Sequence, residues 1–511
     1  MRSEDVPAEF NLATHFVDRN HPDRTALVTD AGPTSYGTLA AEVNRIGNAL
    51  RAVGVGRGDR VLFAMSDGVP FVAAWYAAQK IGAVTAEVYS YLQPAEYRRY
   101  LEYVRPAVVV ADGSTVARLR PAVDGGRRRV PLLVAGPVTD QLRPGELSLA
   151  ALVAEQPDTL DAAGTGRDDI AIWKFTTGST GAARACLLPA RSPLLSFEWY
   201  ASGVLGLRAD DLVLPVPKLF FGYARDLTAL FPFGVGAAGI VFPQRSTPEV
   251  IFELIERHRP TVLVNVPTMM RAMVAHQDAA RHDLSSLRLC TSAGEALPAE
   301  LHRRWLDTFG VEVVDGLGSS EAYHIYLSNR PGAVRPGTLG RPVPGYRLRL
   351  LDEAGDPVPP GEPGMLEVTG ETVATGYWDA PERSAATFPA PHTVRSGDLL
   401  SRDADGFYHY RGRADELLKV GGVWVAPAEI EHCLLTHPAV AGCAVVGYQD
   451  GGLTRPRAFV VPRAEVTAEQ LRAYVRATLA PYKYPRDIRF VDRLPETASG
   501  KLDRAALRTL A

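Results

Sequence analysis

Phe175-Thr-Thr-Gly-Ser-Thr-Gly181, followed by Arg184, is the stretch that says most about the fold of this chain. The apolar residues at 170–173 lead into it and predict a buried strand. A strand that runs into a loop of Thr, Ser and Gly presents hydroxyl and backbone N–H donors outward, and glycines let a ligand approach closely. This composition is typical of a phosphate-binding loop, although taken alone it suits a linker equally well. It is not a Walker loop, because no Gly-Lys-Ser/Thr ends it.

The composition limits the classes of function. The chain has 511 residues, 46% hydrophobic and 22% charged, which predicts a soluble globular protein of roughly two to four domains. A formal net charge of -3 argues against nucleic-acid binding. The cysteines have no metal-type spacing and predict free thiols in a reducing compartment. No signal core opens the chain and no apolar stretch is long enough to span a membrane, so we expect a cytoplasmic protein.

Short apolar runs alternate with helical spacing over most of the chain. This alternation predicts parallel sheets covered by helices. The runs at 61–65, 108–111, 212–216, 261–266 and 287–291 predict strands, and the patterns at 39–53, 250–258 and 299–309 predict helices. After Gly337 the hydrophobic pattern of the sequence changes. Polar and apolar residues alternate at 347–351 and 364–369, which predicts half-exposed antiparallel strands.

A domain boundary is predicted near Gly412-Arg-Ala-Asp415. Beyond it, helices are expected at 427–436 and 467–479, and strands at 440–446, 457–461 and 488–491. The predicted fold class is therefore α/β. A large N-terminal domain at 1–412 has mixed sheets covered by helices and a small β-subdomain. A small, mobile α+β lid domain at 413–511 follows it.

Three further motifs place oxygen groups where a nucleotide could use them. Ser292-Ala-Gly-Glu295 follows a strand, so it lies at the sheet edge where ligands bind in α/β folds, unless it is only a strand-to-helix loop. Asp315-Gly-Leu-Gly-Ser-Ser-Glu321 puts a carboxylate after hydroxyls, which suits Mg²⁺ or, alternatively, a helix cap. Ser396-Gly-Asp398 predicts an acid in a tight turn, suited to a ribose or to the turn itself.

The motifs together resemble those of the acyl-adenylate-forming enzymes, which include acyl-CoA synthetases, peptide-synthetase adenylation domains and luciferases. The resemblance runs from about Thr25 to Leu507, and it is the joint order of the motifs that is specific. The matching segments are Thr176 to Arg184, Asp315 to Glu321, Gly376 to Trp378, Arg395 to Asp398, Gly412 to Asp415, Lys419 to Gly422 and Ser499 to Lys501.

The resemblance implies a site for ATP and Mg²⁺. It assigns the catalytic lysine to Lys501, the metal ligand to Glu321 and the charge that ends the phosphate loop to Arg184. A lysine there would bridge the substrate carboxylate and the α-phosphate, because two anions must be brought together. The other nucleotide-binding positions implied are Thr176, Thr177, Gly178, Ser179, Thr180, Gly181, Gly294, Glu295, Asp315, Gly316, Ser320, Asp398 and Arg413.

Two segments resemble benzoate-CoA ligases and related aryl-acid ligases more closely. They are Pro217-Lys-Leu-Phe-Phe-Gly-Tyr223 and His324-Ile-Tyr-Leu-Ser-Asn-Arg-Pro-Gly332. The resemblance implies a flat aromatic pocket, which suits aromatic and aliphatic walls with small residues beside them. The residues implied are Tyr223, His324 and Ile325, with Gly222, Ala293 and Gly318 as small walls. A buried histidine without a ligand is the alternative for His324.

A second half-reaction is implied in which the acyl group passes to the thiol of coenzyme A. The small domain would rotate about Asp415 and bring Lys419 and the Gly421-Gly422 segment to the active site, where glycines permit close approach of a pantetheine arm. Transfer to the phosphopantetheine of an acyl-carrier protein is a close alternative. Diazotisation of an aryl amine with nitrite, and a relative that only binds nucleotide, are further alternatives.

The sequence departs from the family pattern at the end of the phosphate loop, at Leu187 to Arg191 and after the aromatic segment. The phosphate loop usually ends Pro-Lys-Gly, whereas here it reads Ala183-Arg184-Ala185, in which Arg184 keeps the charge and can grip phosphate through two bonds. Arg225-Asp226 puts charges just after the aromatic segment. We interpret that pair as a sign of a polar ring substituent, such as amino or hydroxyl. The expected partners are thus a small aryl acid, and an acyl-carrier protein in the alternative, with no nucleic acid or membrane.

Overall fold

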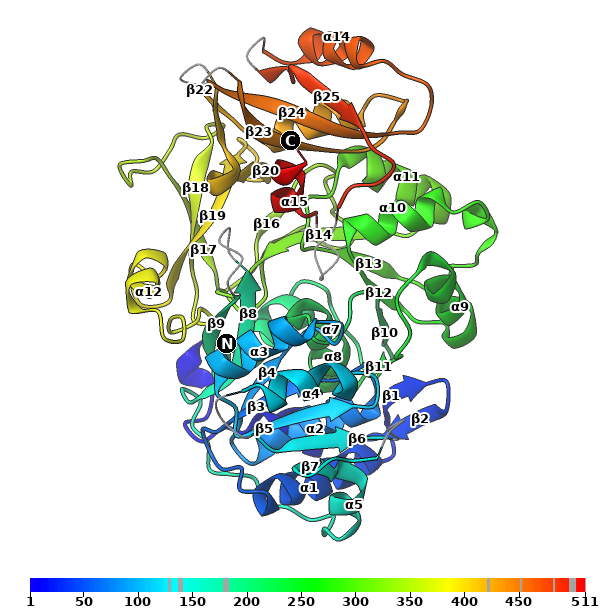
Figure 1. Ribbon diagram of the computed structural model, residues 1–511, viewed down its shortest axis with the longest axis vertical. Helices are drawn as coiled ribbons and strands as arrows, with labels where there is room; N and C mark the ends of the chain where they lie inside the picture. Colours follow the sequence, from blue (N-terminus) through cyan, green and yellow to red (C-terminus); the bar gives the residue numbers. More distant parts are fainter. Residues whose placement is uncertain are drawn as a thin grey trace.

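Two large sheets, a four-stranded antiparallel sheet and a smaller C-terminal segment make up the protein (Figure 1). The computed structural model describes residues 1–126, 130–136, 141–177, 183–420, 423–450, 453–480, 483–495 and 502–510. Within these ranges, no helix is long and apolar enough to cross a membrane. The cysteines there are free and buried, as the sequence predicts: Cys186, Cys290, Cys433 and Cys443.

The first large sheet has seven strands and is parallel except at its β8–β9 edge, where two strands form an antiparallel pair. Its order is β7 (Glu146–Ser148), β6 (Leu132–Ala135), β5 (Val108–Asp112), β3 (Arg60–Ala64), β4 (Val84–Glu87), β8 (Ile170–Thr177) and β9 (Ala183–Pro189). The helices of this part are α1 (Tyr36–Ala52), α2 (Val69–Lys80), α3 (Pro94–Val104), α4 (Val116–Asp124) and α5 (Leu149–Ala154).

The second large sheet has nine strands, with a parallel centre and antiparallel edges. Its order is β16 (Arg341–Pro342), β15 (Ile325–Ser328), β14 (Val313–Gly318), β13 (Leu289–Ser292), β12 (Val262–Asn265), β10 (Leu212–Pro215), β11 (Ala238–Ile240), β1 (Thr25–Thr29) and β2 (Gly32–Ser35). The helices here are α6 (Arg191–Ser196), α7 (Gly222–Ala229), α8 (Phe231–Gly234), α9 (Pro248–His258), α10 (Pro267–Ala275) and α11 (Ala299–Phe309). Short turns of 3-10 or π type lie at η1 (Ser3–Asp5), η2 (Thr14–Asp18), η3 (Phe197–Ser202) and η4 (Ala279–Arg281).

The two sheets share one hydrophobic core. In β3, Val61 and Phe63 face the core between the sheets, whereas Leu62 and Ala64 face α3 and α4. Strands buried on both faces read as continuous apolar runs, which is why the sequence shows them so clearly. Helix α2 lies inside the shared core, and every residue from Phe71 to Lys80 is buried. On the far side of the second sheet, α9, α10 and α11 cover a separate cluster.

An antiparallel four-stranded sheet follows the two large ones. Its strands, in order, are β17 (Arg347–Leu351), β18 (Gly364–Thr369), β19 (Thr393–Arg402) and β20 (Tyr408–Arg413), and α12 (Pro381–Thr387) lies between β18 and β19 in the chain. The antiparallel strands predicted at 347–351 and 364–369 are thereby confirmed. The turn predicted at Ser396-Gly-Asp398 is wrong, because these residues continue through β19. Gly397 has a φ of +76°, so a glycine kink inside a strand produced the turn-like sequence.

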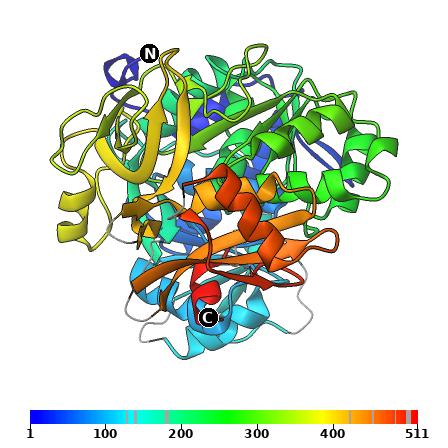
Figure 2. The ribbon, with the colours of Figure 1, turned by 90° about the horizontal axis from the view of Figure 1, so that it is seen from above.

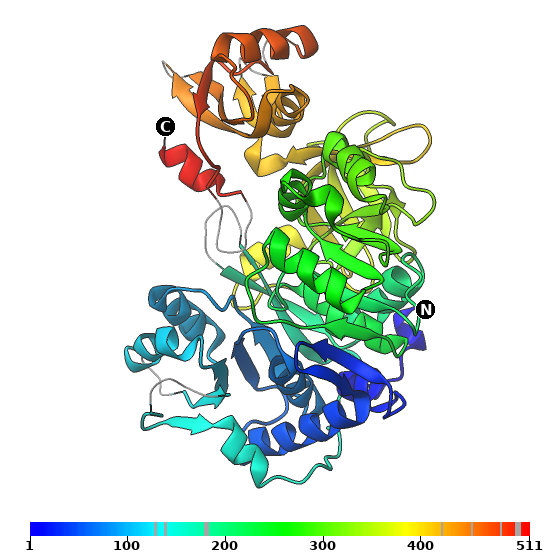
Figure 3. The ribbon, with the colours of Figure 1, turned by 90° about the vertical axis from the view of Figure 1, so that its right-hand side faces the viewer.

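The C-terminal segment lies at the top of the molecule in Figures 1 and 3 and nearest the viewer in Figure 2. It has its own core. It begins after the turn η5 (Ala414–Glu416). Its elements are β21 (Leu418–Val420), β22 (Val423–Val425), α13 (Pro427–Leu435), β23 (Val440–Asp450), β24 (Leu453–Pro462), α14 (Ala468–Thr478), β25 (Asp487–Phe490) and α15 (Arg504–Thr509). Strands β23, β24 and β25 form one sheet and β21–β22 another. The α+β pattern expected for this segment is confirmed, and the exact domain limits at 412 and 413 stay a prediction.

Candidate active site

The predicted nucleotide motifs meet at the carboxyl ends of strands from both large sheets. Strand β8 ends at Thr177, β13 at Ser292 and β14 at Gly318. The first four residues of the predicted Asp315–Glu321 motif, Asp315-Gly-Leu-Gly318, belong to β14 itself. The hydroxyl of Ser320 donates to the Phe175 carbonyl at 3.5 Å, which joins the second sheet's motif to the end of β8. Ligands of open α/β sheets bind at such carboxyl edges.

The phosphate loop itself, including Gly178, Ser179, Thr180 and Gly181, lies outside the described residues. Its two ends are described and are held in register, because Thr176 pairs with Arg184 and Thr177 with Ala183 across the β8–β9 hairpin. The Arg184 guanidinium lies 6.0 Å from the centre of the Tyr377 ring. The hairpin therefore keeps the cation that ends the loop at a set distance from Thr176, and Tyr377 gives its side chain a face to lie against.

Tyr377 also contacts the predicted metal ligand. Its hydroxyl donates to Glu321 Oε1 at 2.7 Å, so one aromatic residue separates Glu321 from Arg184. We expected Tyr377 only as part of the Gly-Tyr-Trp motif and not as a site residue. Among the described residues, no group of three His, Cys, Asp or Glu side chains could hold a metal. A lone half-buried carboxylate fits Mg²⁺ bound mainly by phosphate oxygens and water, and not a cage built by the protein.

The pair predicted for the ribose is assembled across β19 and β20. Asp398 faces Arg413 in the strand register, and the Arg413 guanidinium lies 3.4 Å from Asp398 Oδ1. Burial raises the pKa of Asp398 above its ordinary value, and Arg413 opposes that shift. The same guanidinium donates to Asp415 Oδ1 at 3.2 Å. Arg413 thus links Asp398 to Asp415, the residue predicted as the hinge.

The Ser292–Glu295 motif leaves its strand in the way the sequence suggests. Gly294 has a φ of +87°, which a side chain would strain, and it is exposed at the sheet edge. Glu295 accepts a hydrogen bond from Thr268 Oγ1 at 2.7 Å, which ties it to α10. Asp315 is buried, and burial raises the pKa of its carboxyl to about 8. At neutral pH Asp315 is therefore a neutral hydrogen-bonding group.

The predicted aromatic residues form one buried cluster. The Tyr223 and His324 rings lie 5.7 Å apart between centroids, and the Tyr223 hydroxyl is 2.7 Å from Thr291 Oγ1. Ile325 and Ala293 are buried beside them in the same core. Burial lowers the pKa of His324 to about 3, so its imidazole is neutral at physiological pH. A neutral ring among aromatic and aliphatic side chains is compatible with an apolar, flat ligand.

The two glycines predicted as small pocket walls each allow a close contact within the protein, and their place in a pocket stays a prediction. A Cβ atom on Gly318 would lie 2.5 Å from the His324 carbonyl oxygen, so this glycine allows β14 and β15 to pair closely. A Cβ atom on Gly222 would lie 2.6 Å from Lys174 Cε. The room beside Gly222 is therefore occupied by a lysine side chain.

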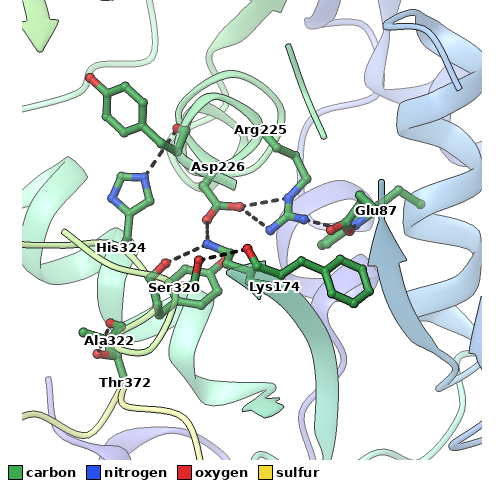
Figure 4. A network of polar contacts seen from close by, with 12 residues as sticks. Glu87, Lys174, Arg225, Asp226, Ser320, Ala322, His324 and Thr372 are labelled. Carbon is green, nitrogen blue, oxygen red and sulfur yellow. Dashed lines mark hydrogen bonds and ion pairs between the residues drawn. The ribbon is translucent and has the colours of Figure 1, made fainter. Parts of the chain in front are cut away.

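That lysine belongs to a buried charge network that sequence reasoning missed (Figure 4). Lys174 Nζ lies 2.5 Å from Asp226 Oδ2, and Arg225 contacts Asp226 at 2.8 Å and Glu87 at 2.7 Å. The side chains of these four residues, which we call the buried quartet, are at most 5% exposed. The charges predicted to mark a polar ring substituent are thus paired with one another. A signal was available, because Lys174 is the one charge in the apolar strand Ile170–Thr177.

Several predicted residues are only partly covered by the structure. Lys501, Gly421 and Gly422 lie outside the described residues, and for Lys419 only the backbone, in β21, is described. The chain after Lys501 is well anchored. Asp503 N–H donates to the Pro495 carbonyl at 2.8 Å, and Arg504 pairs with Glu416 beside the predicted hinge at 3.2 Å.

Two sheets that share a core, followed by a separate C-terminal α+β segment, are the architecture of adenylate-forming enzymes. Family models agree with this. The AMP-binding enzyme model matches residues 15–378, and the AMP-binding enzyme C-terminal domain model matches residues 429–501. The chain belongs to the AMP-binding enzyme family.

Individual relatives resemble it over their full length. The benzoate–CoA ligase of Thauera aromatica is 40% identical over 516 aligned positions, which cover 99% of this chain and 97% of the relative. The crystal structure of the anthranilate CoA ligase AuaEII in complex with anthranoyl-AMP matches with a TM-score of 0.94 at 36% identity, covering 100% of this chain and 99% of that one. A benzoate CoA ligase from Burkholderia xenovorans LB400 matches with a TM-score of 0.90 at 39% identity, covering 98% and 100%. The predicted family and fold class are confirmed.

Asp315→Asn is expected to gain stability relative to the parent protein as pH rises. The folded carboxyl keeps its proton up to about pH 8, whereas its ordinary pKa is 3.8. Between these values the folded state binds more protons than the unfolded state, so the parent's stability falls as pH rises. An amide at this position would have no such proton to lose. The urea midpoint of Asp315→Asn relative to that of the parent should rise as pH rises across this window. The midpoint of Asp307→Asn, on the exposed face of α11, should show no such change relative to the parent. A difference between Asp315→Asn and the parent that stays constant with pH would contradict the raised pKa of Asp315.

Proposed function

We propose that this protein is an ATP-dependent aryl-acid CoA ligase. A carboxylate oxygen of a benzoate-type acid attacks the α-phosphorus of ATP, the bond to pyrophosphate breaks, and an aryl-adenylate forms. The thiol sulfur of coenzyme A then attacks the acyl carbon, loses its proton, and AMP leaves. The observation that carries the proposal is the Tyr223–His324 cluster beside the carboxyl ends of β8, β13 and β14, in a chain 40% identical to a benzoate–CoA ligase.

The described residues support roles in nucleotide binding. Thr176 and Arg184, which flank the loop, would face the departing pyrophosphate, and a guanidinium suits this because it binds phosphate through two parallel bonds. Asp398 would accept from the ribose hydroxyls while Arg413 holds its carboxylate. Glu321 would hold Mg²⁺, which when bound neutralises phosphate charge. Its orientation is set by the Tyr377 hydroxyl.

Coenzyme A is the favoured acceptor because the relatives named for this chain are CoA ligases. Free coenzyme A and a carrier protein present the same pantetheine thiol, so the chemistry of acyl transfer is the same for both. They differ in the protein surface that each needs for docking. No contact among the described residues favours diazotisation of an aryl amine with nitrite, or a role limited to nucleotide binding. The AuaEII complex contains anthranoyl-AMP, which supports an aminobenzoate as one candidate acid.

The test is ATP-dependent pyrophosphate release across benzoate, aminobenzoates, hydroxybenzoates, cinnamates and fatty acids, with products identified by mass. We expect benzoate-sized acids to be used and aryl-CoA to form when coenzyme A is added. Preference for long fatty acids would contradict the aryl site. If the adenylate forms but no aryl-CoA does, and the acyl group passes to a carrier protein, then the carrier protein is the acceptor.

Lys501→Ala is predicted to lower aryl-adenylate formation by about 10²–10³-fold, the size of effect seen when one preorganised donor is lost from a transition state. Thioester formation from a synthetic aryl-adenylate should survive, because the lysine acts only in the first step. Lys483→Ala is the matched control, since Lys483 lies in the same C-terminal segment and pairs with Glu429. Near-parental adenylation by Lys501→Ala would remove this residue from the mechanism.

Arg184→Ala is predicted to raise the apparent KM for ATP several-fold, because the charge at the end of the phosphate loop is lost. Arg184→Lys should retain part of the function, since it keeps the charge but loses the second hydrogen bond. Steady-state kinetics with ATP as the varied substrate measure both. If both variants have parental ATP kinetics, the loop acts through its backbone donors alone.

A further inference from the structure

A cavity of about 460 Å³ lies at the amino ends of β3, β4 and β8, at the opposite edge of the seven-stranded sheet from the candidate active site. Small-molecule sites usually have volumes of about 300–1,000 Å³, so this cavity is large enough for a ligand. Its apolar walls include Ile170, Leu187 and Trp378, and its charged lining residues are Arg57, Arg60 and Asp169. The cavity is thus separate from the residues assigned to the nucleotide and the aryl acid.

Arg60 brings to this cavity a positive charge that no described carboxylate balances. Its Nε donates to the Val104 carbonyl at 2.8 Å, and its Nη2 donates to the Arg105 carbonyl at 3.0 Å. Both partners are neutral, whereas Arg57 forms an ion pair with Asp169 at 2.6 Å. Two arginines and one aspartate leave the lining with one net positive charge. A half-buried guanidinium without a counter-ion is favourable ground for one anionic group.

Indole rings lie directly beside that guanidinium. The rings of Trp173 and Trp378 are 4.9 Å apart between centroids, and the Arg60 guanidinium lies 5.8 Å and 5.7 Å from their centres. Trp378, Ile170 and Leu187 are each only half-buried at this wall. A flat ring packs well against an indole, and a carboxylate on that ring could pair with the neighbouring guanidinium. The lining therefore favours an aromatic carboxylate.

The cavity wall is joined by backbone contacts to the candidate active site. Trp378 N–H donates to the carbonyl of Ala185 at 3.0 Å, and Ala185 follows Arg184 in β9. Tyr377, one residue before Trp378, contacts both Arg184 and Glu321. A ligand that packs against Trp378 therefore bears on the short segment that supports the residues predicted to bind phosphate and Mg²⁺.

We propose that this cavity is a second binding site, for a small aromatic monocarboxylate, and that its occupant alters nucleotide use through the Tyr377–Trp378 segment. The carboxylate pairs with Arg60 while the ring packs against Trp378. The proposed acid substrate belongs to this chemical class, so a second substrate molecule is the expected occupant. The altered nucleotide use rests on the proposed function, whereas the binding site does not.

The chain offers a matched control for the loss of Arg60. Arg330 is also half-buried, and it too is held by two backbone carbonyls, those of Ser328 at 3.2 Å and Pro342 at 2.9 Å. It lies outside the cavity. Arg60→Gln and Arg330→Gln therefore each remove a guanidinium bound to carbonyls, and only the first removes a charge from the cavity.

The binding experiment labels the protein with 5-fluorotryptophan and follows its ¹⁹F signals during titration with benzoate. The Trp378 signal, assigned by its loss in Trp378→Phe, should shift and saturate, while that of Trp305, buried on α11, should not move. Arg60→Gln should weaken this binding about tenfold, because a hydrogen bond to a charged group is lost. Arg330→Gln should bind as the parent does. Methyl benzoate lacks the charge and cyclohexanecarboxylate lacks the flat ring, so each should bind more weakly than benzoate.

A second variant keeps the test decisive if Arg60→Gln folds poorly. Ile170→Phe leaves Arg60 in place and fills part of the cavity, so it should also weaken the response of Trp378 to benzoate. In crystals of the parent, 4-bromobenzoate should give an anomalous bromine signal beside Trp378. Bromine found in the candidate active site alone would overturn the second site. A bromine signal in the cavity without a ¹⁹F response in solution would mean binding at crystal concentration only, and would overturn it as well.

Kinetics test the coupling to the candidate active site. The rate of pyrophosphate release plotted against aryl-acid concentration should depart from a hyperbola in the parent and in Arg330→Gln, and should be hyperbolic in Arg60→Gln. A hyperbola in the parent would overturn the coupling, and parental benzoate binding by both Arg60→Gln and Ile170→Phe would overturn the site. If no aryl acid supports pyrophosphate release, the proposed function fails, and the ¹⁹F titration still decides whether the cavity binds.

Discussion

One ammonium group joins the two large sheets at the level of the candidate site. Lys174 Nζ belongs to β8 of the seven-stranded sheet, and its partners are Asp226 on α7 and the carbonyl of Tyr323 between β14 and β15 of the nine-stranded sheet. Burial lowers the pKa of Lys174 to about 8, and Asp226 opposes that shift. Removing one member of such a buried pair typically costs about 3–5 kcal/mol, because the other charge is stranded. The relative position of the sheets at the site therefore depends on the buried quartet remaining complete.

The quartet also explains local choices of residue. Glu87 and Asp226 would each be costly to bury alone, and Arg225 reaches both. Arg225 further lies over the Trp75 ring at 4.8 Å, so α2 is tied to the same network. Gly222 is small because Lys174 fills the space beside it. The formal positive charges of Lys174 and Arg225 cancel the negative charges of Glu87 and Asp226, which lets a charged network lie directly beside an aromatic cluster.

The nucleotide side of the site depends on a different residue. Tyr377 contacts both Glu321 and Arg184, so the carboxylate predicted to bind Mg²⁺ and the cation predicted to bind phosphate share one aromatic support. On the C-terminal side, Arg413 links Asp398 to Asp415, and Arg504 pairs with Glu416 one residue further on. The carboxylate predicted to bind the ribose is thus linked through Arg413 to the turn predicted as the hinge. A change in the conformation of that turn would therefore alter the contact between the Arg413 guanidinium and Asp398.

The sequence by itself determined the family, the α/β class and many of the buried strands and amphipathic helices, because strands buried on both faces and Thr/Ser/Gly motifs leave patterns in the local order of residues. It placed Asp398 in a turn because a glycine kink inside β19 has the same local composition as a turn. Only the tertiary structure decided that Arg225 and Asp226 neutralise Lys174 and Glu87, and that Tyr377 supports Glu321. These partners come from distant parts of the chain; Lys174 and Asp226, for example, are separated by 52 positions. Ion pairing in a core depends on which side chains meet in space, and no local pattern encodes that meeting.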